Sequence, residues 1–391
     1  MIPRSLSRRK AAGRLLAVLS AAVLTACAPM SMPGGGGGPA LTPGEPVQVA
    51  LLVPGGSGVA SDAFLAENLE NAARMAVRDL GDVEIDLRVY DTGANPTQAA
   101  NAAANAANEG AQVVLGPLYA ESANAAGVAL SGTGINVLAF SNNPTIAGGN
   151  VFVLGPTFRN TANRLVSWGM GQGLTRYYVA HADDLQGQLG LAEIQAAVQR
   201  AGGTVVGARG YALSQQDVQA AAGPIASEAQ AAGAQVLFLT AGVNADLPIL
   251  ATALPEAGLT PDAVRYMGLT RWDVAPQALS LPGLQGGVFA IPNTATQAAF
   301  DQRYRSTYGE EPHPLAGLAY DGIAAIGALA QRGQGLGAQD LTTGQGFQGT
   351  QGIFRLLSDG TNQRGVAVAT IRNGQVTVID PAPGSFSGTG F

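Results

Sequence analysis

The chain has 391 residues, of which 47% are hydrophobic and 12% are charged, and its formal net charge is −6. Without the five cations of residues 1–26, the remaining chain has 16 basic against 27 acidic side chains, a net charge of −11. This balance argues against a nucleic acid as partner, since phosphate binding requires a basic face.

Residues 1–26 have the pattern of a lipoprotein signal peptide. A basic start is followed by an apolar run over residues 15–24 and then by Leu24-Thr25-Ala26-Cys27, which is a lipobox. The apolar run is too short for a permanent membrane helix. We expect Cys27 to be lipidated and to become the mature N-terminus; the alternative is an ordinary signal peptide followed by a chance cysteine. Once Cys27 is lipidated, no cysteine is left for disulfides, thiol catalysis or metal binding.

Residues 27–46 predict a flexible tether, because they are rich in glycine and proline and cannot bury a core. Ala28 follows the cysteine where an aspartate would favour the inner membrane of enteric-type bacteria. We therefore expect a lipid-anchored protein of the cell envelope that faces the periplasm, in the outer membrane rather than the inner one. Residues 381–391 are expected to be a second flexible tail.

From Val47 onward, strand-like and helix-like segments alternate. The first half predicts strands over residues 47–53, 83–89, 112–115, 135–140 and 151–154, with helices over 64–80, 97–109 and 122–130 between them. The second half predicts helices over 160–170, 189–201, 217–232 and 246–254, and strands over 177–180, 204–206, 235–240, 264–269 and 288–291. Helical crossovers between strands indicate parallel sheets with helices on both faces. About 345 residues are more than one core usually holds, so we expect two lobes.

The later part of the chain changes character. Helices are expected over residues 297–308 and 315–330. Three strands, over 353–357, 366–371 and 376–379, are then separated by Asp359-Gly360 and Asn373-Gly374. Such pairs favour hairpins, so the C-terminus is predicted to be an antiparallel segment.

One short repeat links the two halves. Residues 110–113 and 233–236 have the same sequence, Gly-Ala-Gln-Val, and each follows an alanine-rich helix and enters a strand. Either the match marks equivalent strands in two similar lobes or it is chance in a chain so rich in alanine and glycine.

Catalytic motifs are missing, so an enzyme is not expected. No lysine follows Lys10, which excludes a P-loop or a Schiff-base lysine from the mature chain. There is no G-x-S-x-G elbow, and the two histidines, His181 and His313, lack metal-ligand spacing. The turn around Ser57 lacks the third glycine of a dinucleotide-binding loop, so no nucleotide cofactor is predicted. The histidine spacing likewise predicts no metal site.

A ligand cleft is expected beyond the carboxyl ends of the strands, where open parallel sheets collect ligands. Alternatives remain for several candidates: Ser141 and Asn143 could instead cap a turn, His181 could simply end a strand, and Arg271 could be a surface cation beside a structural Trp272. The candidate cleft residues are Ser57, Tyr119, Ser122, Ser141, Asn143, His181, Thr270, Arg271 and Tyr320.

These landmarks, in this order, resemble the type I periplasmic-binding-protein family in its leucine/isoleucine/valine-binding branch. The residues that carry the resemblance are 47–58, 110–117, 135–143, 266–268, 300–309, 318–321 and 347–352. The resemblance implies two α/β lobes with a ligand between them, joined by crossings near Pro156, Pro292 and Gly344. The N-terminal lobe would comprise residues 47–156 and 293–344, and the C-terminal lobe residues 157–292 and 345–380.

The ligand residues of that branch match poorly. Its amino-acid binders hold the ligand amine with a glutamate just after the strand that corresponds to residues 266–268, where this chain has Leu269, Thr270 and Arg271. Of the serines that bind the ligand carboxylate, the loop after Pro117 keeps only Ser122. A buried ammonium without its carboxylate would cost several kcal/mol, roughly, so ordinary amino-acid binding is in doubt.

A lipid anchor together with such a cleft resembles the penicillin-binding-protein activators, outer-membrane lipoproteins that stimulate a peptidoglycan synthase. The preferred prediction is therefore a non-catalytic regulator of peptidoglycan synthesis. The alternative is a substrate-binding lipoprotein of an ABC transporter for branched-chain amino acids, amides or another small polar solute. The expected partners are the membrane, reached through the lipid, then a synthase or a permease, and a small polar ligand.

Overall fold

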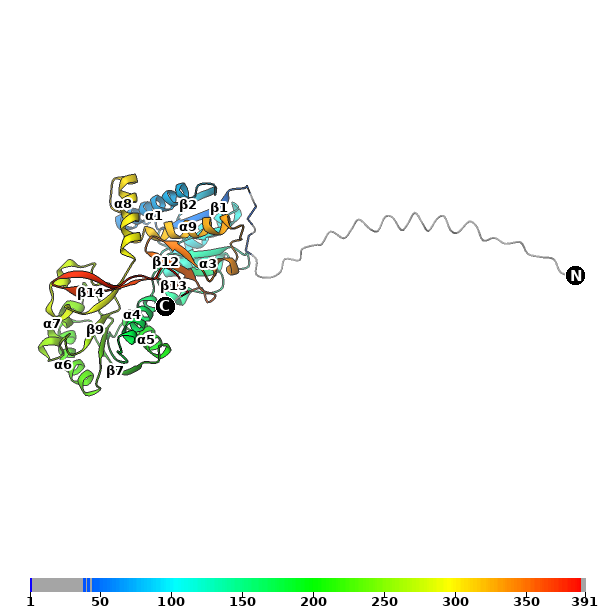
Figure 1. The fold of residues 1–391 in the computed structure, drawn as a ribbon. Coiled ribbons are helices and arrows are strands. Elements are labelled where there is room, and N and C mark those ends of the chain that lie inside the picture. Colours follow the sequence, from blue (N-terminus) through cyan, green and yellow to red (C-terminus); the bar gives the residue numbers. More distant parts are fainter. Residues whose placement is uncertain (2–37, 40, 43, 388–391) are drawn as a thin grey trace.

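The N-terminal lobe is built on a parallel sheet that begins with the buried strand β1 (Val47–Val53). In the computed structural model, which describes residues 1, 38–39, 41–42 and 44–387, the five strands have the order β2-β1-β3-β4-β5. The other four strands are β2 (Ile85–Asp91), β3 (Val113–Leu115), β4 (Asn136–Ala139) and β5 (Val151–Val153). A helix connects each of these strands to the next, so the chain returns and the strands run parallel, as the alternating pattern predicts (Figure 1).

Helices cover both faces of this sheet. One apolar cluster joins β1 to α1 (Ala60–Asp79) and α9 (Gly317–Gln331). A second cluster joins the opposite face to α2 (Pro96–Asn108) and α3 (Ala120–Ala129). The other helices of this lobe are η1 (Pro144–Ile146), α8 (Thr294–Tyr308) and α10 (Ala338–Leu341).

The C-terminal lobe contains a seven-stranded sheet of order β15-β14-β10-β9-β8-β6-β7. Its parallel strands are β6 (Arg176–Ala182), β7 (Thr204–Tyr211), β8 (Val236–Leu239), β9 (Arg265–Gly268) and β10 (Val288–Ile291). The antiparallel pair β14 (Ala367–Arg372) and β15 (Gln375–Asp380) extends it. The helices are α4 (Phe158–Gly171), α5 (Leu185–Arg200), α6 (Gln215–Ala231), α7 (Leu247–Glu256), η2 (Pro276–Ser280) and η3 (Pro282–Leu284). The two-lobed α/β fold predicted from the sequence is confirmed.

The repeated Gly-Ala-Gln-Val segments lie at equivalent places. β3 lies between β1 and β4, and β8 lies between β6 and β9 in the same parallel sense. The carbonyl oxygen of the Gln112 side chain accepts from Gln48 N at 2.9 Å, and that of Gln235 accepts from Arg176 N at 3.1 Å. The repeat therefore marks corresponding strands of two similar lobes.

The C-terminal strands differ from the single antiparallel segment that the sequence predicts. Asp359-Gly360 and Asn373-Gly374 do form hairpins, but the two hairpins belong to different sheets. The small sheet of β11 (Phe347–Gly349), β12 (Gly352–Leu356) and β13 (Asn362–Arg364) packs Phe347 and Phe354 into the same cluster as β1. These side chains need an apolar partner, and the N-terminal lobe provides it.

The third crossing between the lobes consequently lies at Gly365, between β13 and β14, and not near Gly344. The other two crossings are residues 154–156, between β5 and α4, and Pro292, between β10 and α8. The expectation of a flexible tail from residue 381 is wrong for residues 381–386, which contact the folded lobes. The carbonyl oxygen of Pro381 accepts from Arg164 at 3.0 Å, and the Phe386 ring lies 4.6 Å from the Arg355 guanidinium carbon.

Cys27, its lipobox and residues 28–37 lie outside the described residues. Within the part that is described, no helix is long and apolar enough to cross a membrane.

Candidate ligand-binding cleft

The carboxyl ends of both sheets meet at the junction of the lobes. β5 of the first lobe and β10 of the second each lead directly into a crossing, so the carboxyl edge of each sheet adjoins the other lobe. The loops after β1, β3 and β4 therefore lie across the junction from the loops after β6, β8 and β9. This is where parallel sheets present ligand-binding loops.

A buried ion pair ties the crossings to the N-terminal lobe. Arg364 pairs with Asp321 of α9 at 3.2 Å, and these side chains are 3% and 0% exposed. Arg364 Nε also donates to the carbonyl oxygen of Leu154 at 3.0 Å, and the Asp321 carboxylate accepts from Thr350 N at 2.6 Å. Burial raises the pKa of Asp321, while Arg364 opposes that shift. One cation thus joins the first crossing, the third crossing and α9.

Two asparagines continue this network into the C-terminal lobe. The Asn362 side chain donates to the carbonyl oxygens of Val153 and Gly155, both at 2.8 Å, and the backbone carbonyl oxygen of Asn362 accepts from the Asn160 side chain of α4 at 3.1 Å. Sequence analysis missed this network. The available signal was Asp321, the one charged residue of the apolar stretch 315–330; Arg364 lies in a polar stretch that gives no such signal.

Three candidates of the N-terminal lobe stabilise their own turns. Ser57 Oγ accepts from Val59 N at 3.1 Å, and Ser141 Oγ accepts from Asn143 N at 3.1 Å. Asn143 is the N-cap of η1 and accepts from Thr145 N at 3.0 Å. Ser141 and Asn143 therefore cap a turn, as the alternative interpretation of the sequence proposed. This turn lies beside the junction of the lobes.

Tyr119 and Ser122 begin α3 at the same edge. The Tyr119 hydroxyl donates to Asp62 of α1 at 2.5 Å, and this bond, together with burial, raises the pKa of Tyr119 to about 12. The ring remains 40% exposed. Ser122 is buried, and its hydroxyl has no hydrogen-bond partner among the described residues.

The C-terminal lobe presents His181, Thr270 and Arg271. His181 is 6% exposed, with Nδ1 at 3.0 Å from the carbonyl oxygen of Ala182 and 3.9 Å from the Asp183 carboxylate. Thr270 Oγ1 donates to the carbonyl oxygen of Ala241 at 2.8 Å. Arg271 is an exposed cation that donates from Nε to Asp273 at 3.0 Å.

Trp272, next to Arg271, is fully buried and packs its ring on Phe289, with centroids 5.3 Å apart. The Arg271-Trp272 pair is thus a surface cation beside a core tryptophan, the second of the two alternatives.

Tyr320 lies away from the other candidates. Its hydroxyl donates at 2.7 Å to Asp79, the last residue of α1. Since α1 runs back from the carboxyl end of β1, Asp79 lies toward the amino ends of the strands. Tyr320 is therefore not at the junction, whereas the other eight cleft candidates follow strand ends that face it.

Exposed apolar side chains gather at these edges. Six of the nine large hydrophobic side chains that are exposed in the described residues follow the carboxyl end of a strand, in a loop or in the first two turns of the next helix. They are Val59, Phe64 and Tyr119 on the first lobe and Leu185, Leu213 and Val274 on the second. No group of three or more metal-ligating side chains occurs in the described part of the chain.

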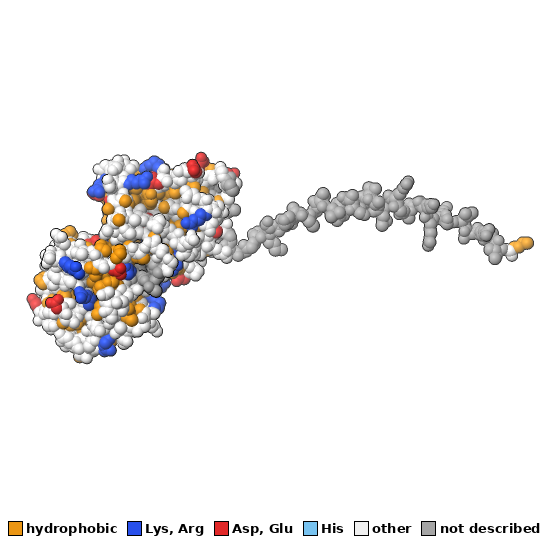
Figure 2. Space-filling model, viewed as in Figure 1, with side chains coloured by type: hydrophobic (Ala, Val, Ile, Leu, Met, Phe, Trp, Pro, Cys, Tyr) orange, Lys and Arg blue, Asp and Glu red, His pale blue; other side chains and the backbone are white. Residues whose placement is uncertain are grey.

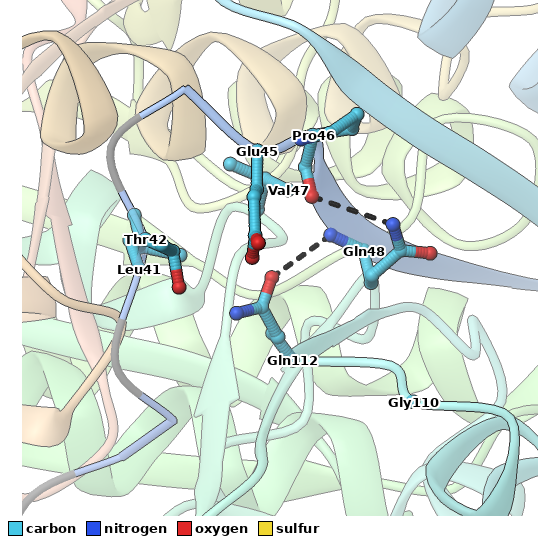
Figure 3. A pocket seen from close by; sticks show the side chains of 8 residues that line it. All are labelled: Leu41, Thr42, Glu45, Pro46, Val47, Gln48, Gly110 and Gln112. Atoms are coloured by element: carbon cyan, nitrogen blue, oxygen red, sulfur yellow. Dashed lines mark hydrogen bonds between the residues drawn. The ribbon is translucent and has the colours of Figure 1, made fainter.

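The opposite, amino edge of the first sheet has a separate hollow of about 260 Å³. Leu41, Thr42, Glu45 and Pro46 line it on one side and Gly110 and Gln112 on the other, where the Gln112 side chain accepts from Gln48 N (Figure 3). This hollow lies away from the cleft.

A profile described as periplasmic binding protein matches residues 46–375. Among solved structures, a putative branched-chain amino acid ABC transporter from Rhodospirillum rubrum is similar with a TM-score of 0.72 and 18% identity, over 86% of this chain and 100% of that one. An ABC transporter substrate-binding protein from Desulfitobacterium hafniense in complex with Leu has a TM-score of 0.61 and 19% identity, over 86% and 100%. A solute-binding protein of an ABC transporter from R. palustris in complex with benzoate has a TM-score of 0.55 and 17% identity, over 88% and 99%. None of the curated proteins is a match.

Proposed function

The chain belongs to the periplasmic binding protein family, and from this premise we propose that it is the solute receptor of an ABC permease. Proteins of this family bind small ligands in the periplasm or cell envelope. The proposed ligand site is the junction of the lobes, closed by rotation about residues 154–156, Pro292 and Gly365.

The exposed apolar side chains at the two facing edges carry this proposal. The placement of Phe64, Leu185 and Val274 after strand ends on both lobes supports the proposal, because closure of the lobes would remove apolar surface at these edges from water. Figure 2 shows hydrophobic side chains at the surface of both lobes. Closure of the lobes over a ligand would bury the facing set, which stabilises the closed form by about 25 cal/mol for each Å² covered.

The same edges indicate the chemistry of the ligand. The Tyr119 ring, 40% exposed, and the exposed Leu185 offer apolar contact, while Arg271 offers a guanidinium and Asp183 a carboxylate that is 51% exposed. A small molecule with an apolar body and a charged end fits this set. The ligands of two similar proteins, the zwitterion leucine and the anion benzoate, both have that character.

A transport receptor is preferred here to the cell-wall activator that sequence analysis favoured. All three similar structures described above are named for ABC transporters. The predicted lipobox and tether suit either function, because both need a binding lobe held near a membrane. The lipid anchor at Cys27 and its placement in the outer membrane stay predictions. Mass spectrometry of the mature N-terminus and release of a Cys27→Ser variant from membranes test the anchor.

Thermal melting with candidate solutes tests the proposed function. The set would contain leucine, benzoate, their amides and other small polar solutes. A ligand present at a hundred times its dissociation constant stabilises the native state by about 2.7 kcal/mol and raises the melting temperature accordingly. Leu185→Ser should weaken the response to the bound solute, whereas Val128→Ser, in the exposed last turn of α3 and at the end of that helix away from the junction, should not. No response to any solute, together with capture of a peptidoglycan synthase from membranes, would favour the activator instead.

A further inference from the structure

A second hollow, of about 470 Å³, lies in the C-terminal lobe at the amino ends of β9 and β10, opposite the edge that faces the cleft. Its walls are the end of α4, with Trp168 and Gln172, and the sheet, with Arg265 and Arg372. Volumes of this order hold small organic ligands.

The two arginines converge on one turn. Arg265 donates a hydrogen bond to the carbonyl oxygen of Gly286. Gly286 N donates at 2.8 Å to the carbonyl oxygen of Ile371, which immediately precedes Arg372. Gly286 has a φ of +73°, and a Cβ there would lie 3.5 Å from Arg265 Nη1. The positive φ favours glycine at this turn, and both arginines line the hollow beside it.

No carboxylate balances this pair of charges. None of the residues that line the hollow is acidic. Neither Arg265 nor Arg372 forms an ion pair with any residue that the structure describes. The arginines that do are Arg74, Arg88, Arg159, Arg164, Arg209, Arg271, Arg303, Arg305 and Arg364. Two cations at one turn in an otherwise acidic protein repel each other, and an anion between them would remove that cost.

The other lobe closes the corresponding position. Arg265 pairs with Val236 in the sheet just as Asn136 pairs with Val113. Asn136 is 5% exposed, and its side chain donates at 2.7 Å to the carbonyl oxygen of Leu336, in the segment that follows α9. The C-terminal lobe instead has a half-buried arginine that borders an open hollow.

We propose that this hollow binds an oxyanion, a carboxylate or a phosphate, attached to an apolar or aromatic group. Guanidinium groups donate paired hydrogen bonds to both kinds of oxyanion. The partly exposed Trp168 ring and Ile379 supply an apolar wall for the rest of the molecule. The source of the anion is either a soluble small molecule or a phospholipid headgroup, since the two share this chemistry.

Calorimetric titration of the mature chain with phenyl phosphate and with inorganic phosphate tests the site. Saturable binding is expected, tighter for phenyl phosphate. Arg372→Gln, at an exposed position, should weaken binding about tenfold through loss of charge-assisted hydrogen bonds. Arg332→Gln, an exposed arginine of the other lobe, removes the same charge and should change nothing. Trp272 is buried, so a change in tryptophan fluorescence on binding reports Trp168, the only other tryptophan.

Other outcomes would overturn the proposal. These are no saturable binding of either anion, or equal weakening by Arg372→Gln and Arg332→Gln. Co-sedimentation with phosphatidylglycerol vesicles separates the two sources. Vesicle binding that Arg372→Gln abolishes supports a headgroup, and phenyl phosphate binding without vesicle binding supports a soluble ligand. Vesicle binding that Arg372→Gln leaves intact, without any phenyl phosphate binding, counts against the site.

Discussion

The two lobes share one structural unit and use its ends differently. In each lobe an alanine-rich helix ends at a glycine, and the glutamine that follows bonds back to the first strand of the sheet, Gln112 to Gln48 and Gln235 to Arg176. The hollow at the amino edge of the first lobe is lined by residues such as Leu41, Glu45 and Gln112 and has no arginine, whereas Arg265 and Arg372 line the hollow at the amino edge of the second. Equivalent strands therefore do not imply equivalent surfaces. What covers an edge is decided by the segments that lie outside the repeat.

The lobes also differ in how they hold charge. The buried Arg364–Asp321 pair belongs to the N-terminal lobe and fixes the crossings to it. The C-terminal lobe meets the same crossings through Arg164, which donates to the carbonyl oxygen of Val366 at 2.8 Å and pairs with Asp380. Gly365 lies between these two anchors; it is buried, and its N–H donates to the carbonyl oxygen of Ile353 at 2.8 Å.

The largest expected effect is the loss of that buried pair. Arg364→Met removes the cation that pairs with the buried Asp321 carboxyl group, which should lower the free energy of unfolding by about 3–5 kcal/mol. Urea denaturation measures the change. Arg305→Met, which breaks the exposed pair with Glu311, should cost about 1 kcal/mol or less. Equal costs for the two variants would show that the buried pair does not anchor the crossings.

The next effect tests the packing of corresponding strands. Gly268 corresponds to Ala139, but a Cβ on Gly268 would lie 2.4 Å from the Trp272 ring. Gly268→Ala should therefore destabilise the protein by about 1–3 kcal/mol through overpacking. The near-ultraviolet circular dichroism of Trp272 should change as well.

The opposite change in the first lobe, Ala139→Gly, should cost only about 1 kcal/mol, from the lost methyl group and the added backbone freedom. If Gly268→Ala were tolerated without a change in the Trp272 signal, the close approach of that ring would be in error.

A smaller effect is expected from the repeat itself. Gln112→Ala and Gln235→Ala each remove an acceptor from backbone N–H groups at a helix-to-strand junction. Each should cost about 1 kcal/mol, and the two costs should add because the sites are far apart. Chemical denaturation of the single and double variants gives both quantities. If one of the two substitutions left the free energy of unfolding unchanged, the two junctions would be similar in geometry but not in their contribution to stability.

The smallest effect concerns His313, between α8 and α9. Burial lowers its pKa below the usual 6.5. The unfolded chain therefore binds a proton at a higher pH than the folded chain does, and stability is lost as the pH falls below about 6.5. His313→Gln should flatten this part of the pH profile of unfolding. An unchanged profile would assign the pH dependence to other groups.

Much of the architecture follows from sequence periodicity. The alternation of β-strand and helix patterns predicted two parallel α/β lobes, and the Gly-Ala-Gln-Val repeat marked corresponding strands, because backbone hydrogen bonding and burial impose these patterns locally. The hairpin pairs Asp359-Gly360 and Asn373-Gly374 were identified for the same reason, since their backbone preferences suffice for a turn.

The site was less predictable. Eight of the nine cleft candidates lie at the junction of the lobes, because the position of a residue after a strand decides which edge it occupies. Tyr320 was placed there wrongly, since a helix position does not say how far a long side chain reaches; its hydroxyl bonds to Asp79 instead.

Composition and the alternation of strands and helices in two parallel-sheet lobes were thus available from the sequence alone, while the lipobox and the place of the ligand cleft stay predictions. Tertiary structure alone decided the third crossing, the buried Arg364–Asp321 pair and the convergence of Arg265 and Arg372. The physical reason is the same in all three cases. Each depends on contacts between segments far apart in the chain, such as residues 321 and 364 or 265 and 372, and local residue patterns contain no information about which distant partner will satisfy a charge or cover an apolar strand.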